Sequence, residues 1–266
     1  MKKITIVILI MALTGCAHYY YAPNAANIPL FKEKNTFKLK GGYSGDYYDG
    51  SDIQMAYSAS KNIGVMVNSF FATETETVQG IFSNTWSHDE SGKGSYIEAA
   101  VGYYQPFGEH KVWIFETYGG AGVGGESHIY ASSQSSKLHL TKYFIQPSLG
   151  YSAKKGHLEV GLSSRFSALN LKVTHSDLSM QSNESEKHNL DYISLHPASI
   201  LWEPSLMIAA GGEYVKFYLQ ATLSNNLNNH YLPMDEGNMS VGIKVALKNS
   251  HRKNTTKNNS VAPSSN

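Results

Sequence analysis

The chain has 266 residues, of which 16% are charged and 12% aromatic, and its formal net charge is +1. A charge this close to zero provides no strong field for nucleic acid or another polyanion, so we expect no nucleic-acid partner. Apolar residues are numerous enough to form a core, and tyrosine alone occurs 18 times.

The N-terminal stretch has the layout of an export signal. Lys2 and Lys3 form a positive start, and residues 4–13 form an apolar run that is too short to span a bilayer as a helix. The run ends in Leu13-Thr14-Gly15-Cys16, which resembles the lipobox of bacterial lipoproteins.

The resemblance implies that residues 1–15 are a signal peptide and that Cys16 carries the lipid, palmitate included, after cleavage. Cys16 is also the single cysteine, so an internal disulfide is excluded. Ala17, in place of Asp, resembles sorting to the outer membrane. The alternative is an ordinary signal peptide with a chance cysteine. Residues 16–35 are broken by Pro23 and Pro29 and are interpreted as a lipidated tether.

The clearest strand pattern lies in residues 143–151 and 157–167. Both alternate with a period of two, which is typical of strands with one apolar face. Between them, residues 153–156 end in Gly156, which suits the positive φ of a tight turn. This ribbon is the pattern that we look for in the rest of the chain.

The same period predicts ten strands in all, and no segment after the signal shows a convincing helical period. The predicted strands are 36–43, 52–59, 62–71, 95–105, 111–121, 143–151, 157–167, 201–210, 213–223 and 237–247.

Short and long connections alternate along these strands. An up-and-down barrel in an outer membrane has short periplasmic turns and longer external loops. We therefore predict an all-β fold, a ten-stranded antiparallel transmembrane barrel over residues 36–247, followed by a disordered polar tail at 248–266. In strand and loop pattern the chain resembles small outer-membrane β-barrel proteins of Gram-negative bacteria, although the last strand lacks the terminal aromatic residue that many of them have.

Period two alone does not orient the faces, because soluble barrels also alternate, with apolar residues inside. Here the polar face is rich in Gly, Ala and Ser, as a narrow interior requires. We therefore place the apolar face outward and the polar face in the lumen. The charged residues assigned to a lumen network are Glu98, Glu116, Glu159, Arg165, Glu203, Lys216 and Lys244.

Two interpretations of that network stay open. It is either a set of salt bridges that fills the barrel or the lining of a channel for small solutes. A further alternative is a lipid-anchored soluble barrel with an apolar ligand inside.

Signals for catalysis are weak. Residues 120–125 match G-x-G-x-x-G, but no helix follows that would hold a pyrophosphate. The histidines, among them His128 in a predicted loop, lack zinc-site spacing. A hydrolase could use His139, His157 and Ser163, yet no nucleophile elbow is present. We expect no catalytic residue, metal or cofactor.

The sequence thus predicts an outer-membrane, lipid-anchored β-barrel protein. Its expected partners are membrane lipids, through the N-terminal anchor and the barrel exterior. The expected role is structural or surface interaction without catalysis, with the long loops as the contact surface.

Overall fold

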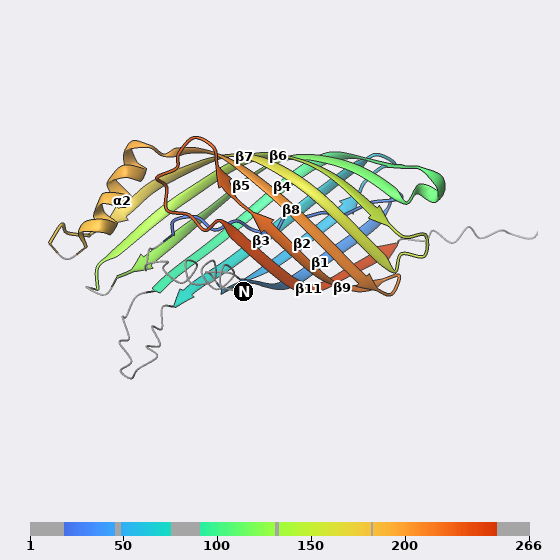
Figure 1. Ribbon diagram of the computed structural model, residues 1–266, viewed down its shortest axis with the longest axis horizontal. Coiled ribbons are helices and arrows are strands. Elements are labelled where there is room, and N and C mark those ends of the chain that lie inside the picture. Colours follow the sequence, from blue (N-terminus) through green and yellow to red (C-terminus); the bar gives the residue numbers. More distant parts are fainter. Residues whose placement is uncertain (1–18, 46–48, 76–90, 131–132, 182, 249–266) are drawn as a thin grey trace, which may run out of the picture.

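The structure is a computed structural model that describes residues 19–45, 49–75, 91–130, 133–181 and 183–248. The predicted signal peptide, the lipidation site Cys16 and the tail from residue 249 onward lie outside the described residues. Within the described part, strands dominate and wrap into a single barrel (Figure 1). The elements in chain order are β1 (Thr36–Gly45), β2 (Asp49–Ser58), β3 (Ile63–Thr75), β4 (Ser91–Phe107), η1 (Glu109–Lys111), β5 (Trp113–Ile129), β6 (Ser135–Ser152), β7 (Leu158–Ser176), α2 (Glu184–Leu195), β8 (Ala198–Gly211), β9 (Val215–Leu223), β10 (Asn225–Asn226) and β11 (Gly237–Lys248).

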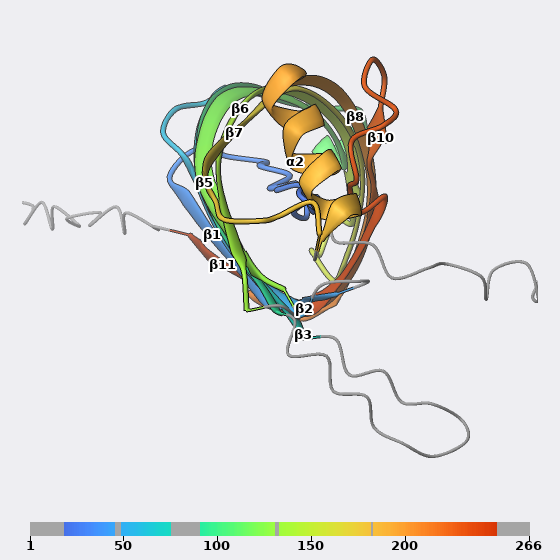
Figure 2. The ribbon, with the colours of Figure 1, turned by 90° about the vertical axis from the view of Figure 1, so that its left-hand side faces the viewer.

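The sheet closes on itself. Each strand from β1 to β9 pairs antiparallel with the next, β9 pairs with β11, and β11 returns to β1 in the register Thr36↔Lys248. The two-residue β10 only adds a short pairing to β8. Viewed along its axis, the described chain forms a complete ring (Figure 2). This confirms the predicted ten-stranded antiparallel barrel with its short turns at one end and long loops at the other.

The apolar face points outward, as predicted. Leu162, Val241 and Ile243 are 57%, 55% and 45% exposed, whereas Glu159 and Lys244 are buried inside the ring. A barrel that holds an apolar ligand would need the opposite arrangement, so the structure contradicts that alternative.

Several strands run further than predicted at the long-loop end. β5, β6 and β7 have 17, 18 and 19 residues, so much of the predicted loop 122–141 is strand. At these strand ends the contrast between the two faces fades in the sequence, although ladder pairs such as Ser127↔Lys137 continue.

One prediction about secondary structure is wrong, because α2 lies in the connection between β7 and β8. Its first turns are polar, and only Leu190 and Ile193 are buried, so the apolar period is too short to recognise. These two side chains belong to the same buried cluster as Tyr20 and Tyr130. The helix lies across the long-loop opening of the barrel (Figure 2).

The second difference concerns residues 19–35, which we call the lumen segment. The sequence suggests a tether outside the barrel, but the described part of it lies inside the ring (Figure 2), and residues 23–31 are all buried. Tyr20 and Tyr21 are buried in the same way. Tyr104 also points inward and contacts Phe31.

Candidate functional site

The lumen segment crosses the barrel from one end to the other. At the long-loop end, the Tyr20 N–H donates to the Pro233 carbonyl at 2.9 Å, and the Tyr20 hydroxyl donates to Glu186 of α2 at 2.5 Å. At the short-turn end, the Asn35 N–H donates to the Ser58 carbonyl at 2.8 Å, beside the turn from β2 to β3. The chain therefore enters β1 only after traversing the whole lumen.

Side chains of the wall bind the backbone of this segment. Each carbonyl from residue 25 to residue 30 accepts a hydrogen bond from a lumen side chain, and two of them accept from two. The bonds are Gln54 to Ala25 (2.7 Å), Gln220 and Lys40 to Ala26 (2.8 and 3.4 Å), Gln146 to Asn27 (2.7 Å), Lys244 to Ile28 (3.0 Å), Lys38 and Lys244 to Pro29 (2.6 and 3.2 Å) and Lys38 to Leu30 (2.9 Å). An extended chain without a neighbouring strand must find partners for its polar backbone, and here the barrel wall supplies them.

Glu116 accepts hydrogen bonds from backbone N–H groups of the same segment. Its two carboxylate oxygens accept the N–H groups of Leu30 and Phe31 at 3.0 and 2.8 Å. This residue, assigned from sequence to a salt-bridge network, thus binds backbone amides with its negative charge buried. Hydrogen bonds to a charged acceptor are stronger than neutral ones, so Glu116 is a firm anchor for the segment.

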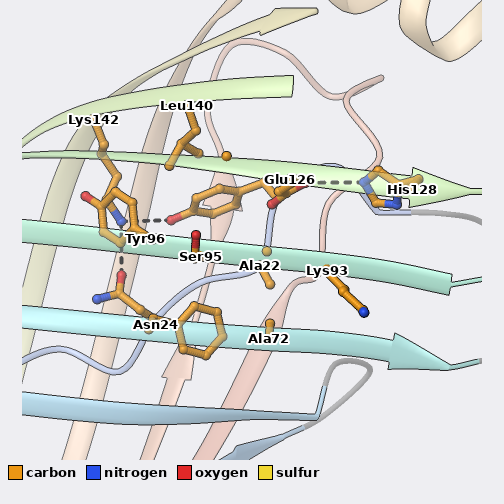
Figure 3. Close-up of a pocket in the computed structure, with 14 residues that line it drawn as sticks. Ala22, Asn24, Ala72, Lys93, Ser95, Tyr96, Glu126, His128, Leu140 and Lys142 are labelled. Atoms are coloured by element: carbon orange, nitrogen blue, oxygen red, sulfur yellow. Dashed lines mark hydrogen bonds and ion pairs between the residues drawn. The ribbon is translucent and has the colours of Figure 1, made fainter. Parts of the chain in front are cut away.

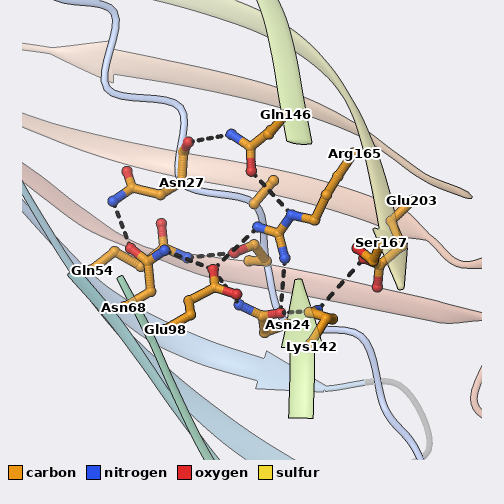
Figure 4. Close-up of polar contacts among 12 residues, drawn as sticks. Asn24, Asn27, Gln54, Asn68, Glu98, Lys142, Gln146, Arg165, Ser167 and Glu203 are labelled. Atoms are coloured by element: carbon orange, nitrogen blue, oxygen red, sulfur yellow. Dashed lines mark hydrogen bonds and ion pairs between the residues drawn. The ribbon is translucent and has the colours of Figure 1, made fainter. Parts of the chain in front are cut away.

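The centre of the lumen holds a polar cluster around Arg165 (Figure 4). Its guanidinium lies 3.4 Å from Glu98 and donates to Gln146 and Asn24, each at 3.0 Å. Asn24 belongs to the lumen segment and also donates to Glu98 at 3.2 Å. Asn68 of β3 donates to the same carboxylate at 2.7 Å. One Asn of the lumen segment therefore bonds to both buried charges.

A second charge pair lies beside the first. Lys142 of β6 lies 3.5 Å from Glu203 of β8 and donates to the Tyr21 hydroxyl at 2.9 Å. The Tyr21 hydroxyl in turn donates to Glu203, and Ser167 donates to the other oxygen of that carboxylate at 2.8 Å. Tyr21 of the lumen segment thereby bridges the acid and the base.

Near the short-turn end, three lysines surround the carboxylate of Glu159. Lys244, Lys216 and Lys38 approach its carboxylate at 2.7, 3.4 and 3.6 Å, and all four groups are buried. Three lysines around one carboxylate leave an excess of positive charge, and two of them point on to the carbonyls of the lumen segment. Carbonyl oxygens are the acceptors that satisfy the remaining ammonium protons.

Glycines of the wall make room for the apolar side chains of the segment. A Cβ on Gly150 would lie 2.2 Å from Leu30 Cδ2, and one on Gly161 would lie 2.8 Å from Ile28 Cγ2. The Gly-rich polar face, recognised from sequence as a narrow interior, is therefore shaped around this segment.

All seven residues assigned to the lumen network lie inside the barrel and are buried. They form two groups, one around Arg165 and one around Glu159, and Glu116 makes its described hydrogen bonds with backbone. Sequence reasoning missed Lys142, Gln146 and the segment's own Tyr21 and Asn24. The first two share the inward period of Phe144 and Ser148, which is the signal that could have found them.

The candidate catalytic residues do not come together. His139 is exposed on the outside of β6, whereas Ser163 is buried on the lumen side of β7. The glycines 120–125 lie within β5 and form no phosphate loop. His128, placed by the sequence analysis in a loop, belongs to β5, because this strand extends past the predicted loop boundary. Its side chain is 1% exposed and lies 3.6 Å from Glu126.

The described residues contain no group of three or more His, Cys, Asp or Glu placed to hold a metal ion. They also contain no helix with the length and apolar character of a membrane span.

Cavities lie at both ends of the segment. Near the long loops, a small cavity of about 30 Å³ is lined by residues that include Ala22, Tyr96 and Leu140 (Figure 3). At the short-turn end, a cavity of about 340 Å³ is lined by Lys32, Lys154, Lys155 and other charged residues. Lys32 donates to the Ser152 and Ala153 carbonyls at 2.8 and 2.9 Å, and burial lowers the pKa of its ammonium group.

No family model and no curated protein sequence matches this chain. Among solved structures, it is similar to a major outer membrane protein from Thermus thermophilus, with 10% identity over 80% of this chain and 98% of that chain, at a TM-score of 0.35. It is also similar to the translocator domain of the autotransporter NalP from Neisseria meningitidis, with 11% identity over 80% and 86% and a TM-score of 0.41. A third similar structure is OmpT, an outer membrane protein of Vibrio cholerae, with 11% identity over 81% of this chain and 62% of that chain, at a TM-score of 0.28.

The pairing of the strands, by itself, shows a closed ten-stranded antiparallel β-barrel.

Proposed function

We propose that this protein is an outer-membrane lipoprotein whose barrel is filled by its own N-terminal segment and whose role is structural or surface interaction, without catalysis. The observation that carries the proposal is the backbone binding inside the lumen, where wall side chains donate hydrogen bonds to six consecutive carbonyls of the lumen segment. Such a lumen is built to hold a chain in place.

The outer surface supports placement in a lipid bilayer. Apolar side chains such as Leu206, Leu219 and Val241 are each about half exposed on consecutive strands of the wall. In water this belt would be an aggregation surface, whereas hydrocarbon solvates it. Trp113 and Tyr151 pack edge to face at the short-turn end, where aromatic rings favour the interface.

Electrical recording tests the filled lumen. The purified full-length protein, reconstituted in a planar bilayer, is expected to show no steady conductance, because buried side chains occupy the axis. The variants Glu159→Gln and Arg165→Ala are recorded in the same way as wild type. If the lumen conducts, removing either charge should change the measured current. A steady wild-type current that responds to these substitutions would favour the small solute channel and overturn the filled barrel.

Lipid labelling tests the anchor. Cells that express the protein and are fed an alkyne analogue of palmitate are expected to label the wild-type chain, whereas Cys16→Ala should abolish the label. Ser163→Ala, a buried lumen substitution outside the lipobox, is the matched control and should label as wild type. Persistent labelling of Cys16→Ala would refute the proposed anchor.

A further inference from the structure

We propose that the cavity at the short-turn end of the lumen binds a small soluble anion that carries a phosphate group. This site goes beyond the structural role proposed above and does not depend on the lipid anchor. The charged side chains that line the cavity, and the ion pairs that they already form, carry the proposal.

The cavity reaches from solvent into the buried interior of the barrel. Lys154 and Lys155, in the turn between β6 and β7, line it and are exposed, whereas Lys38, Glu159 and Lys216 line it and are buried. The turn therefore lies at the mouth and the buried charges at the inner end. A volume of about 340 Å³ holds many water molecules, so a phosphate ion fits together with part of its hydration shell.

Positive charge is in excess along the lining. Six lysines and three glutamates line the cavity, which leaves a formal excess of three positive charges. Glu33 and Glu213 share Lys248, at 3.0 and 3.4 Å. The third carboxylate, that of Glu159, is surrounded by the three lysines described above. An anion that enters the cavity therefore meets surplus cations, while each lining carboxylate already has a cation beside it.

Lys32 is the cation best placed to meet this anion. It is half-buried in the lining and donates to the Ser152 and Ala153 carbonyls at 2.8 and 2.9 Å, which uses two of its three ammonium protons. The two carboxylates that act on it electrostatically, Glu159 and Glu33, form their described ion pairs with other lysines. The third proton and the charge of Lys32 are thus available to a ligand.

The arrangement of the lysines favours a phosphate group over a carboxylate. The cations come from four parts of the chain, because Lys32 belongs to the lumen segment, Lys38 to β1, Lys216 to β9 and the exposed pair to the turn between β6 and β7. A phosphate group has oxygens in several directions and more charge than a carboxylate, and lysine binds it as a point charge.

The position of the lining favours a soluble anion over a lipid headgroup. Ser152 and Ala246 line the cavity and are buried on the inward face of the wall. The next residue in the chain, Leu247, is 56% exposed on the outward face. A lipid would have to leave the outward apolar belt to place its headgroup in the cavity, whereas a soluble anion enters past the turn.

Isothermal titration calorimetry with inorganic phosphate tests the site. The full-length protein is kept in micelles of a neutral, phosphate-free detergent, and sodium chloride at equal ionic strength is the control titrant for screening. We expect saturable phosphate binding by wild type and binding weakened about tenfold or more in Lys32→Gln, because one hydrogen bond to a charged group is lost. Lys61→Gln, in the exposed turn between β2 and β3 at the same end, is the matched control and should bind as wild type.

A second variant keeps the test decisive if Lys32→Gln does not fold. Lys154→Gln combined with Lys155→Gln changes only exposed side chains at the mouth and should also weaken phosphate binding. Folding of each variant is checked by its shifted migration in unheated gel samples. Absence of phosphate binding by wild type, or equal binding by wild type and the folded cavity variants, would overturn the proposal.

Native mass spectrometry with phosphatidic acid added to the same micelles separates the two sources of a phosphate group. We expect the lipid to be retained equally by wild type and Lys32→Gln, because the cavity lies inside the ring. If wild type retains phosphatidic acid more than Lys32→Gln does and shows no binding of inorganic phosphate, the cavity takes a lipid headgroup and the soluble anion is ruled out.

Discussion

At the scale of single residues, the lumen is organised by buried charges that share partners. Arg165 has Glu98, Gln146 and Asn24 within reach, and the pair with Glu98 is almost completely shielded from water. Removing one member of such a pair costs more than the pair itself contributes, because the remaining charge stays buried without its partner.

Arg165→Ala is therefore expected to destabilise the barrel by about 3–5 kcal/mol. Urea unfolding in lipid vesicles, followed by tryptophan fluorescence, measures this change in the free energy of unfolding. Lys155→Ala, an exposed residue of a short turn, is the control and should stay within about 0.5 kcal/mol of wild type. The double variant Arg165→Met with Glu98→Met should recover part of the loss. A cost near zero for Arg165→Ala would mean that Glu98 has another cation.

A second prediction at this scale concerns the stability cost of enlarging a glycine of the barrel wall. Gly161→Leu places new atoms against Ile28 of the lumen segment, and overpacking of this kind costs about 1–3 kcal/mol. Gly119→Leu is the matched control, because its Cβ would point outward with nothing nearer than 4.0 Å. The same urea unfolding compares the two variants. Equal stability of both would show that the segment does not press on Gly161.

At the scale of elements, the lumen segment acts as a strand without a ladder. Residues 25–31 of it form no ladder, and their backbone hydrogen bonds go to glutamines, lysines and Glu116 of the wall instead of to a neighbouring backbone. Helix α2 and the connection before β11 hold its long-loop end. The barrel wall itself closes through β1–β11 and does not use this segment as a strand.

Deletion of residues 19–31 is expected to open the barrel, because the lumen groups that bind the segment would then be hydrated. Planar bilayers should show steady channels for the deletion variant and none for wild type. A synthetic peptide of residues 19–35, added from the short-turn or long-loop side, should block these channels, and a scrambled peptide of the same composition is the control. The deletion variant counts as folded if its gel migration differs between heated and unheated samples. If such a folded variant gives no current, other groups close the lumen.

At the scale of the whole molecule, the outward apolar belt decides where the protein is stable. A cation at the middle of the belt costs about 2–4 kcal/mol in a bilayer, and near the interface only about 0–1 kcal/mol. Ile243 lies near the middle of β11, and Leu247 lies on the same face near its short-turn end. The two positions differ mainly in depth.

Ile243→Arg is accordingly expected to destabilise the protein in phospholipid vesicles several-fold more than Leu247→Arg. Equilibrium folding into vesicles in urea measures both changes. Similar costs at the two positions would argue that Ile243 does not face the hydrocarbon layer.

The sequence alone determined the barrel, its strand count, the alternation of turns and loops and the outward apolar face. These features are local, because side chains along a strand alternate at every second residue wherever a lipid face meets a lumen. It was also enough to place Glu98, Glu159 and Arg165 inside. It failed for α2 and for the long ends of β5–β7, where outward positions are no longer required to be apolar.

Only the tertiary structure decided what fills the lumen. The lumen segment has no period of its own, and its partners lie far away in sequence, as the separation of 141 positions between Asn24 and Arg165 shows. Its backbone is bound by side chains from many strands, so its place depends on the closed ring and not on any local pattern. The stretch that the sequence analysis interpreted as a tether therefore fills the lumen. Its backbone polar atoms need hydrogen-bond partners, and side chains of the barrel wall provide them.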